Sequence, residues 1–122
     1  MAKNPVGWFE IYVDDFERAK KFYQDVLKVE FQKLEGPDQM WAFPMDNEGR
    51  GSSGALIHMD GFPAGRNSVL VYFMSEDCSV EEARVVPAGG RVQKTKFSIG
   101  QYGFITLAVD TEGNMFGIHS MK

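Results

Sequence analysis

Two different periods of apolar residues organise the first thirty positions of the chain. From Phe9 to Val13 three apolar residues alternate with Glu10 and Tyr12, which is typical of a half-buried β-strand. From Phe16 to Leu27 apolar residues recur three and four positions apart, so this segment is predicted to form an amphipathic helix. The helix is expected to pack on the apolar face of the strand. Trp8, Glu10 and Tyr12 are therefore expected to point to the opposite face.

An acidic turn separates this strand from its helix. Asp14 and Asp15 end the strand and offer a carboxylate to cap the helix N-terminus. The same plan returns near Leu70, where a second apolar strand is followed by Glu76 and Asp77. A second, shorter helix is predicted after this turn, from residue 79 to residue 86.

The remaining apolar segments are short and are separated by turn residues, which predicts further strands. Seven are expected: Val29–Leu34, Met40–Pro44, Ala55–Met59, Ser68–Met74, Arg91–Lys94, Phe104–Val109 and Met115–Ser120. Residues 95–103 are expected to form a loop. The segment from residue 60 to residue 67 is rich in Gly and Pro and looks like a connector between two halves.

Short matches indicate that the two halves are copies of one unit. The tripeptide from Phe31 resembles the one from Val92, the DNEG segment at 46–49 resembles DTEG at 110–113, and Ile57-His58 resembles Ile118-His119. Each unit, about 6–60 and about 67–121, reads strand–helix–strand–strand–strand and is too small to bury its own sheet. We therefore expect one α+β domain spanning residues 1–122, built from two βαβββ modules.

Composition narrows the range of partners. The chain has 122 residues, a net charge of −4 and a pI near 5.1, and no basic stripe that would bind nucleic acid. Its single cysteine, Cys78, has no disulfide partner, which favours a reducing, cytoplasmic setting. No apolar run approaches the length of a membrane span, so no membrane association is expected.

Several motifs resemble the vicinal oxygen chelate superfamily, which includes glyoxalase I, extradiol dioxygenases, and the bleomycin- and fosfomycin-resistance proteins. The resemblance rests on VDDFERAKKFYQDVL from Val13, AGGRV from Ala88 and VDTEGNMFGIH from Val109. The NPVGWFEI opening and the SIGQYGF loop are similar to a group of small single-domain glyoxalase-like proteins. The resemblance implies two βαβββ modules that form a curled mixed sheet around a central cleft.

The same resemblance implies a divalent metal bound by four side chains, from the first and last strands of each module. The corresponding positions here are Trp8, about Leu56, Leu70 and Gly117. None of these side chains is a metal ligand. The usual metal is therefore expected to be absent, together with the usual isomerase, lyase or dioxygenase mechanism, and no cofactor is expected.

Alternation along the strands predicts which side chains face the cleft. The set is Trp8, Glu10, Tyr12, Leu56, His58, Leu70, Tyr72, Met74, Met115, Gly117 and His119. Its aromatic and Met side chains with a few polar groups suit a small-molecule site. The alternative is that these side chains fill a sheet interface or a dimer contact.

Three polar members of the set leave two chemical hypotheses open. His58, His119 and Glu10 could form a displaced metal site with two imidazoles and a carboxylate, or could simply line the cleft. Glu10, if desolvated beside Trp8 and Tyr72, would have a raised pKa and could act as a general base. It could equally pair with a basic side chain or face water.

Two further features are interpreted as structural. The DNEG and DTEG segments lack the other oxygen donors of a calcium loop, and their glycine suits a turn. Cys78 follows two acidic residues, which disfavours a thiolate nucleophile.

The leading hypothesis is therefore a metal-independent, glyoxalase/bleomycin-resistance-like protein that binds a small, largely apolar or aromatic molecule. The expected contacts are Trp8, Tyr12, Tyr72, Met74 and Met115, with Glu10 and His119 as polar anchors. One alternative is a glyoxalase-like enzyme that uses the displaced metal or Glu10 as base, and another is a ligand-free structural dimer. A homodimer is expected from the resemblance and because an open sheet edge needs cover.

Overall fold

The computed structural model describes residues 6, 8–35, 39–46, 48–67 and 69–122. Within these residues the chain forms the elements β1 (Trp8–Tyr12), α1 (Phe16–Leu27), β2 (Gln32–Leu34), β3 (Gln39–Ala42), β4 (Ser53–His58), β5 (Tyr72–Met74), α2 (Cys78–Val85), β6 (Arg91–Ser98), a short 3-10 helix (Gly100–Tyr102), β7 (Phe104–Val109) and β8 (Met115–Ser120). The predicted α+β class is confirmed.

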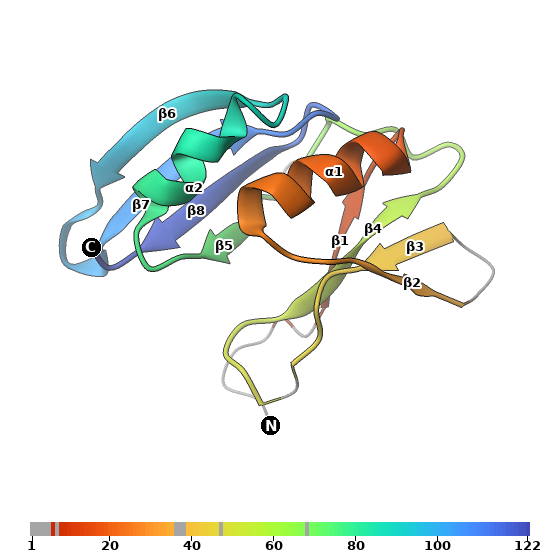
Figure 1. The fold of residues 1–122 in the computed structure, drawn as a ribbon, viewed down its shortest axis with the longest axis horizontal. Coiled ribbons are helices and arrows are strands. Elements are labelled where there is room, and N and C mark those ends of the chain that lie inside the picture. Colours follow the sequence, from red (N-terminus) through yellow and green to blue (C-terminus); the bar gives the residue numbers. More distant parts are fainter. Residues whose placement is uncertain (1–5, 7, 36–38, 47, 68) are drawn as a thin grey trace.

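The strands form two four-stranded mixed sheets, one from each half of the chain (Figure 1). The strand orders are β1-β4-β3-β2 and β5-β8-β7-β6. In each sheet the first strand runs parallel to the fourth strand of its module, and the other pairs are antiparallel. The same topology in both sheets supports the internal repeat. The sheets do not close into a barrel.

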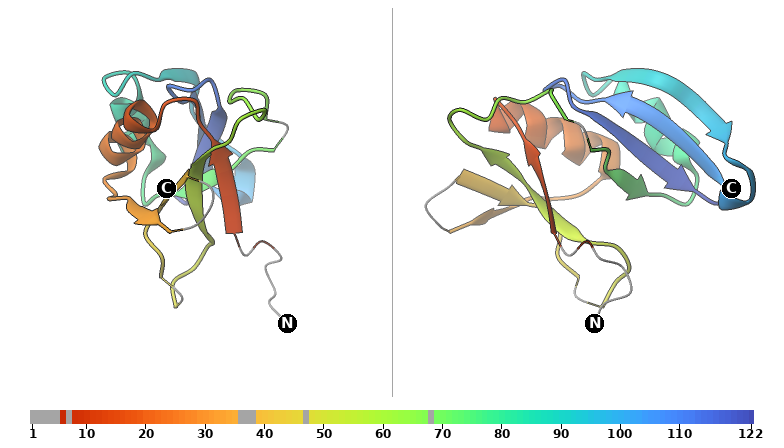
Figure 2. Two further views of the ribbon diagram at one scale, coloured as in Figure 1. Left: turned by 90° about the vertical axis from the view of Figure 1, so that its right-hand side faces the viewer. Right: turned by 180° about the vertical axis from the view of Figure 1, so that it is seen from behind.

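Both helices lie on the same side of the two sheets, as the views from the front and from behind show (Figures 1 and 2). The predicted acidic caps are present at both N-termini. The Asp15 carboxylate accepts a hydrogen bond from the Arg18 amide, and the Asp77 carboxylate accepts one from the Ser79 amide. The opposite side of the sheets carries no helix among the described residues.

An aromatic cluster joins the two modules beneath the helices. The fully buried Tyr23 ring of α1 lies 5.8 Å from Phe43 of the first module, measured between ring centroids. It also lies 5.9 Å from Phe73 and 5.7 Å from Phe116 of the second module. Burial of each such ring stabilises the fold by about 2–3 kcal/mol, so α1 belongs to the core of both modules.

Several strand boundaries differ from the prediction. The structure starts the second strand at Gln32 rather than Val29, and the fifth at Tyr72, while Ser68 lies outside the described residues. The predicted loop at 95–103 is wrong, because β6 continues to Ser98 and is followed by a 3-10 turn. Two register shifts in the β6–β7 pairing break the simple alternation that would have revealed this strand.

The register also corrects the alignment of the repeat. Ile11 pairs with Leu56 in the first module, and Phe73 pairs with Ile118 in the second. Ile11 and Phe73 are equivalent, since each lies four residues before the capping aspartate of its module, so Leu56 corresponds to Ile118. The dipeptide match had instead aligned Ile57 with Ile118. Leu56 is fully buried in the core, so its predicted place in the cleft is wrong. The loops before these strands differ in length, which made the dipeptide match misleading.

None of the described helices has the length and hydrophobicity needed to cross a membrane.

Candidate functional site

A cavity of about 930 Å3 lies between β1 and β5. Its walls include the side chains that β1 turns away from α1, and the buried Tyr23 and Phe116 of the aromatic cluster also line it. A volume of several hundred cubic ångströms is typical of small-molecule sites. The two halves of the chain thus meet at a cleft, which the resemblance implied; the repeat had predicted a shared interface.

Seven of the predicted residues line this cavity: Trp8, Glu10, Tyr12, Leu70, Tyr72, Met74 and Met115. Three of the large apolar side chains are notably open to solvent, with exposed fractions of 39% for Trp8, 45% for Tyr72 and 62% for Met74. Aromatic and Met side chains that remain exposed in a concave surface are typical of a binding site.

The side chains of β1 that line the cavity contact one another and the connector. The Trp8 indole N–H donates a hydrogen bond of 3.2 Å to a carboxylate oxygen of Glu10. The Tyr12 ring stacks on Phe62 of the connector, with 5.8 Å between ring centroids. The Glu10 side chain is exposed, so the burial that the general-base hypothesis required is not present.

The two histidines lie outside the cavity. The His58 ring contacts Phe16 on the helix side of the sheet, and its Nδ1 lies 2.9 Å from the Val13 carbonyl. His119 Nε2 donates to the Tyr102 carbonyl at 2.6 Å. Since Leu56 faces the core, its neighbour His58, two residues along the strand, faces the core side as well. The structure therefore does not bring His58, His119 and Glu10 together.

The metal positions implied by the resemblance can be tested on the corrected register. Pairing places Ala55, not Leu56, opposite Glu10 and in the position equivalent to Gly117. A side chain at Gly117 would overlap the Tyr72 ring, which covers this position. No group of three His, Cys, Asp or Glu residues in the described part of the chain could hold a metal. The residues at these positions do not fit a divalent metal.

Sequence reasoning missed the loops that complete the cavity. Arg50, Gly51 and Ser52 come from the turn before β4, and Pro63, Arg66 and Asn67 come from the connector. Val6, Val69, Val71 and Asn114 also line it. Periodicity carries no information about loop residues, so the hydrophobic pattern could not have identified these positions.

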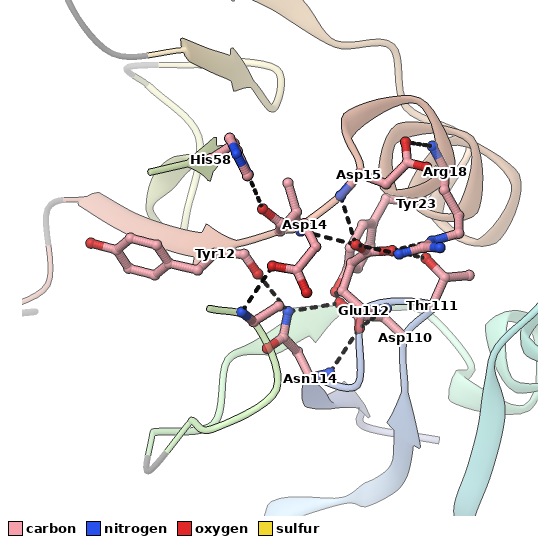
Figure 3. Close-up of polar contacts among 12 residues, drawn as sticks. Tyr12, Asp14, Asp15, Arg18, Tyr23, His58, Asp110, Thr111, Glu112 and Asn114 are labelled. Carbon is pink, nitrogen blue, oxygen red and sulfur yellow. Dashed lines mark hydrogen bonds and ion pairs between the residues drawn. The ribbon is translucent and has the colours of Figure 1, made fainter. Parts of the chain in front are cut away.

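A polar network fixes one end of the cavity (Figure 3). Asn114 donates through its side-chain amide to the Tyr12 carbonyl at 2.9 Å and accepts from the Gly65 amide at 2.8 Å. Its own backbone amide donates to Asp110 at 2.8 Å. This one side chain therefore ties the end of β1 to the connector and to the start of β8.

Glu112 extends the network between the modules (Figure 3). Its carboxylate is fully buried and accepts from the backbone amides of Asp14 and Asp15 at 3.0 and 2.9 Å. It also accepts from the Arg18 guanidinium, at 2.6 and 3.0 Å. Burial alone raises the pKa of Glu112, but these donors together with Thr111 outweigh it and hold the pKa below its ordinary value. The DTEG turn thus clamps the second module to the first.

Tyr23 and Asp110 form a buried pair beneath the cavity floor. The Tyr23 hydroxyl donates a 2.6 Å hydrogen bond to the Asp110 carboxylate. Burial raises the pKa of the Tyr23 hydroxyl well above its ordinary value, and the Asp110 charge adds to this. Burial also raises the pKa of Asp110, although hydrogen bonds from Tyr23 and Asn114 oppose the shift. The pair holds its proton on Tyr23 and serves as an anchor for α1.

The two acidic turns and the cysteine match their structural interpretation. The Gly49 amide donates to the Asp46 carbonyl and the Gly113 amide to the Asp110 carbonyl, so both segments form turns. Cys78 is fully buried, which disfavours thiolate chemistry.

Comparison with known proteins supports the resemblance. Residues 6–35 match the family model described as bleomycin resistance protein-like N-terminal. No curated protein sequence matches the chain.

Several solved structures share the fold. An antibiotic-binding protein from Streptomyces sp. CB03234, TnmS3, has a TM-score of 0.74 and 23% identity over 100% of this chain and 99% of that chain. A glyoxalase/bleomycin resistance protein from Albidiferax ferrireducens T118 has a TM-score of 0.72 and 17% identity over 94% of this chain and 98% of its own. Glyoxalase I from Zea mays has a TM-score of 0.76 and 20% identity over 95% of this chain, which spans 46% of the maize protein.

These matches confirm the glyoxalase-like α+β fold and are consistent with the vicinal oxygen chelate superfamily.

Proposed function

We propose that this protein binds a small, largely apolar or aromatic molecule in the cavity between β1 and β5, without the divalent metal of the related enzymes. The observation that carries the proposal is the set of exposed aromatic and Met side chains around a cavity of about 930 Å3. Exposed apolar area in water is unfavourable. A ligand that covers it gains free energy from that burial.

The geometry favours a flat ligand. Trp8 of β1 and Tyr72 of β5 come from the two strands that border the cavity, and each aromatic face offers an area on which a ring can stack. Met74 and Met115 supply flexible apolar contacts that adapt to different shapes. The fold likeness to an antibiotic-binding protein is compatible with a ligand of this kind.

The metal-free part of the proposal rests on the residues at the four implied positions. Trp8, Ala55, Leu70 and Gly117 have no side-chain atom that can ligate a divalent metal. The enzyme alternative with metal on His58, His119 and Glu10 is disfavoured because the structure separates these groups.

Tryptophan fluorescence tests the proposal directly. The chain has two tryptophans: Trp8 lines the cavity, and Trp41 lies outside it, where the Lys20 ammonium sits 3.4 Å from its ring centroid. A Trp41→Phe variant therefore reports on Trp8 alone. Titration with naphthalene and coumarin probes is expected to quench this emission saturably, and Trp8→Phe is expected to abolish the change.

A cavity variant and a surface control variant distinguish specific binding in the cavity from nonspecific binding of the probes. Tyr72→Ala removes a stacking face and is expected to weaken the probes about tenfold, which corresponds to about 1.4 kcal/mol. Tyr102→Ala removes a more exposed tyrosine (65% against 45% for Tyr72) that is not among the residues lining the cavity, and is expected to leave affinity unchanged. Equal weakening in both variants, or no saturable quenching at all, would contradict the proposal.

We also propose that the protein is a homodimer. Two features support it: the large apolar side chains on the cavity side, and the outer edges of the two sheets, which pair with no further strand among the described residues. Both are usually covered in a stable protein. Light scattering coupled to gel filtration is expected to give twice the monomer mass of 13.7 kDa. A monomer at micromolar concentration would refute this part of the proposal.

A further inference from the structure

The net charge of the cavity lining has the opposite sign to the net charge of the whole chain. The whole protein carries a net charge of −4. The charged residues that line the cavity are Arg50, Arg66 and Glu10, so the cavity carries one net positive charge. A positive site in an acidic protein attracts an anion locally, and the apolar walls beside it strengthen that attraction.

The two arginines lie at opposite ends of the cleft. Arg50 precedes Gly51, which lies beside Met74, and the same turn leads into Ser53, the partner of Trp8. Arg66 follows Gly65, whose amide donates to Asn114, the side chain that also holds the end of β1. Since β1 advances about 3.3 Å per residue, the two ends are about 13 Å apart. A ring system placed between them can reach either guanidinium with an acidic substituent.

The two arginines are available to bind an anionic ligand, because the cavity's own acidic group does not pair with them. In the described part of the chain no ion pair involves Arg50 or Arg66. Glu10 lies between them, and one of its oxygens already accepts from the Trp8 indole. A guanidinium offers a planar set of donors that matches a carboxylate, and it stacks on aromatic rings as well.

From this arrangement we propose that the ligand is an anionic aromatic compound: a planar ring system that carries at least one acidic group, held by Arg50 or Arg66. The inference rests on the proposed function, since it names the chemical class of ligand for the same cavity. It adds a claim of charge selectivity that an apolar cleft alone does not make.

Three probes that share a ring and differ in charge test this inference: 2-naphthoate, 2-naphthamide and 2-naphthylmethylammonium. We expect calorimetric titration to rank naphthoate first, roughly fivefold tighter than the neutral amide, with the cation weakest. The advantage of naphthoate over the amide is expected to shrink as salt is added, because partly exposed charges are screened.

Charge-neutralising variants assign the preference to residues. Arg50→Gln together with Arg66→Gln is expected to bring naphthoate to the affinity of naphthamide, and the single variants identify which arginine holds the acid. Glu10→Gln removes the one negative charge of the cavity and is expected to tighten naphthoate by a fewfold. Arg91→Gln is the matched control, because this arginine of β6 is exposed and its side chain bonds only to Gln93 among the described residues.

The outcomes separate this inference from the proposed function. Equal binding of all three probes would overturn the charge selectivity while leaving the aromatic cleft intact. A naphthoate preference that survives in the double arginine variant would overturn the assignment to Arg50 and Arg66. Failure of all three probes to bind would overturn both the inference and the proposed function on which it rests.

Discussion

Removal of the buried Glu112 side chain, which clamps the second module to the first, is expected to cause a large loss in the free energy of unfolding. In the structure its buried carboxylate accepts the backbone amides of Asp14 and Asp15 through one oxygen. The other oxygen accepts from Arg18 and from the Thr111 hydroxyl. These donors come from both modules, so the carboxylate supports the interface between the two sheets as well as the start of α1.

The expected loss in the free energy of unfolding depends on which hydrogen-bond donors each substitution leaves without an acceptor. Glu112→Ala leaves the two backbone amides without their acceptor, which is expected to lower the free energy of unfolding by about 2–4 kcal/mol. The Arg18 guanidinium also loses its partner, but it is half exposed and water can solvate it, so it adds little to this loss. Glu112→Gln keeps an oxygen for the two amides but presents an NH2 group to the Arg18 and Thr111 donors. The expected loss for this variant is about 1–2 kcal/mol.

The internal repeat supplies the control. Glu48 occupies the same place in the DNEG turn of the first module, but its side chain is exposed. Glu48→Ala is expected to change the free energy of unfolding by less than about 0.5 kcal/mol. Urea unfolding at neutral pH, analysed by linear extrapolation, gives all three values. A Glu112→Ala loss no larger than the Glu48→Ala loss would refute the claim that this turn clamps the modules.

Three further predictions test other parts of the account. Gly54→Ala places a Cβ 2.5 Å from the ring of Phe9, which packs against the core, and is expected to lower the free energy of unfolding by about 1–3 kcal/mol. Gly117→Ala displaces the exposed Tyr72 ring instead and should mainly weaken probe binding. Because burial raises the pKa of Asp110, the wild type should lose stability relative to Asp110→Asn as the pH rises through that pKa; a difference that does not change with pH would contradict this sign. His58→Ala should leave probe affinity in calorimetry unchanged, because this ring faces the core side of the sheet. A severalfold loss of affinity would indicate that His58 contributes to the binding site.

Much of the fold could be predicted because its signals are local and repeated. The α1 boundaries, both acidic caps and the last two strands follow from period and capping chemistry, which neighbouring residues determine. The faces of β1 and β5 were also predictable, since Trp8 and Tyr72 alternate with core residues. Alternation along a strand needs no knowledge of the partner strand.

Pairing between strands could not be predicted in the same way. The face of Leu56 and His58 depends on how β4 registers against β1, and a one-residue slip exchanges the two faces of a strand. The bulges in β6 hid a strand for a related reason, since they interrupt alternation where only pairing with β7 defines it. Both errors arise from contacts between residues far apart in the chain.

The loops of the site were beyond the reach of sequence patterns. Arg50 and Arg66 line the cavity because two turns fold over its ends, and no periodicity marks a turn residue as functional. The role of Glu112 was hidden because DNEG and DTEG look alike, although Glu48 is exposed and Glu112 contacts the other module. Tertiary packing decides between an exposed turn and an interface.

Indole resonances give the most direct test of the central claim that the cavity between β1 and β5 binds a planar ligand. The two indole N–H groups serve as site and internal control, since Trp8 lines the cavity and Trp41 does not. On titration of 15N-labelled protein with 2-naphthoate, the account predicts a saturable shift of the Trp8 indole signal and no change in the Trp41 signal. Equal shifts at both indoles, or none at Trp8, would contradict it.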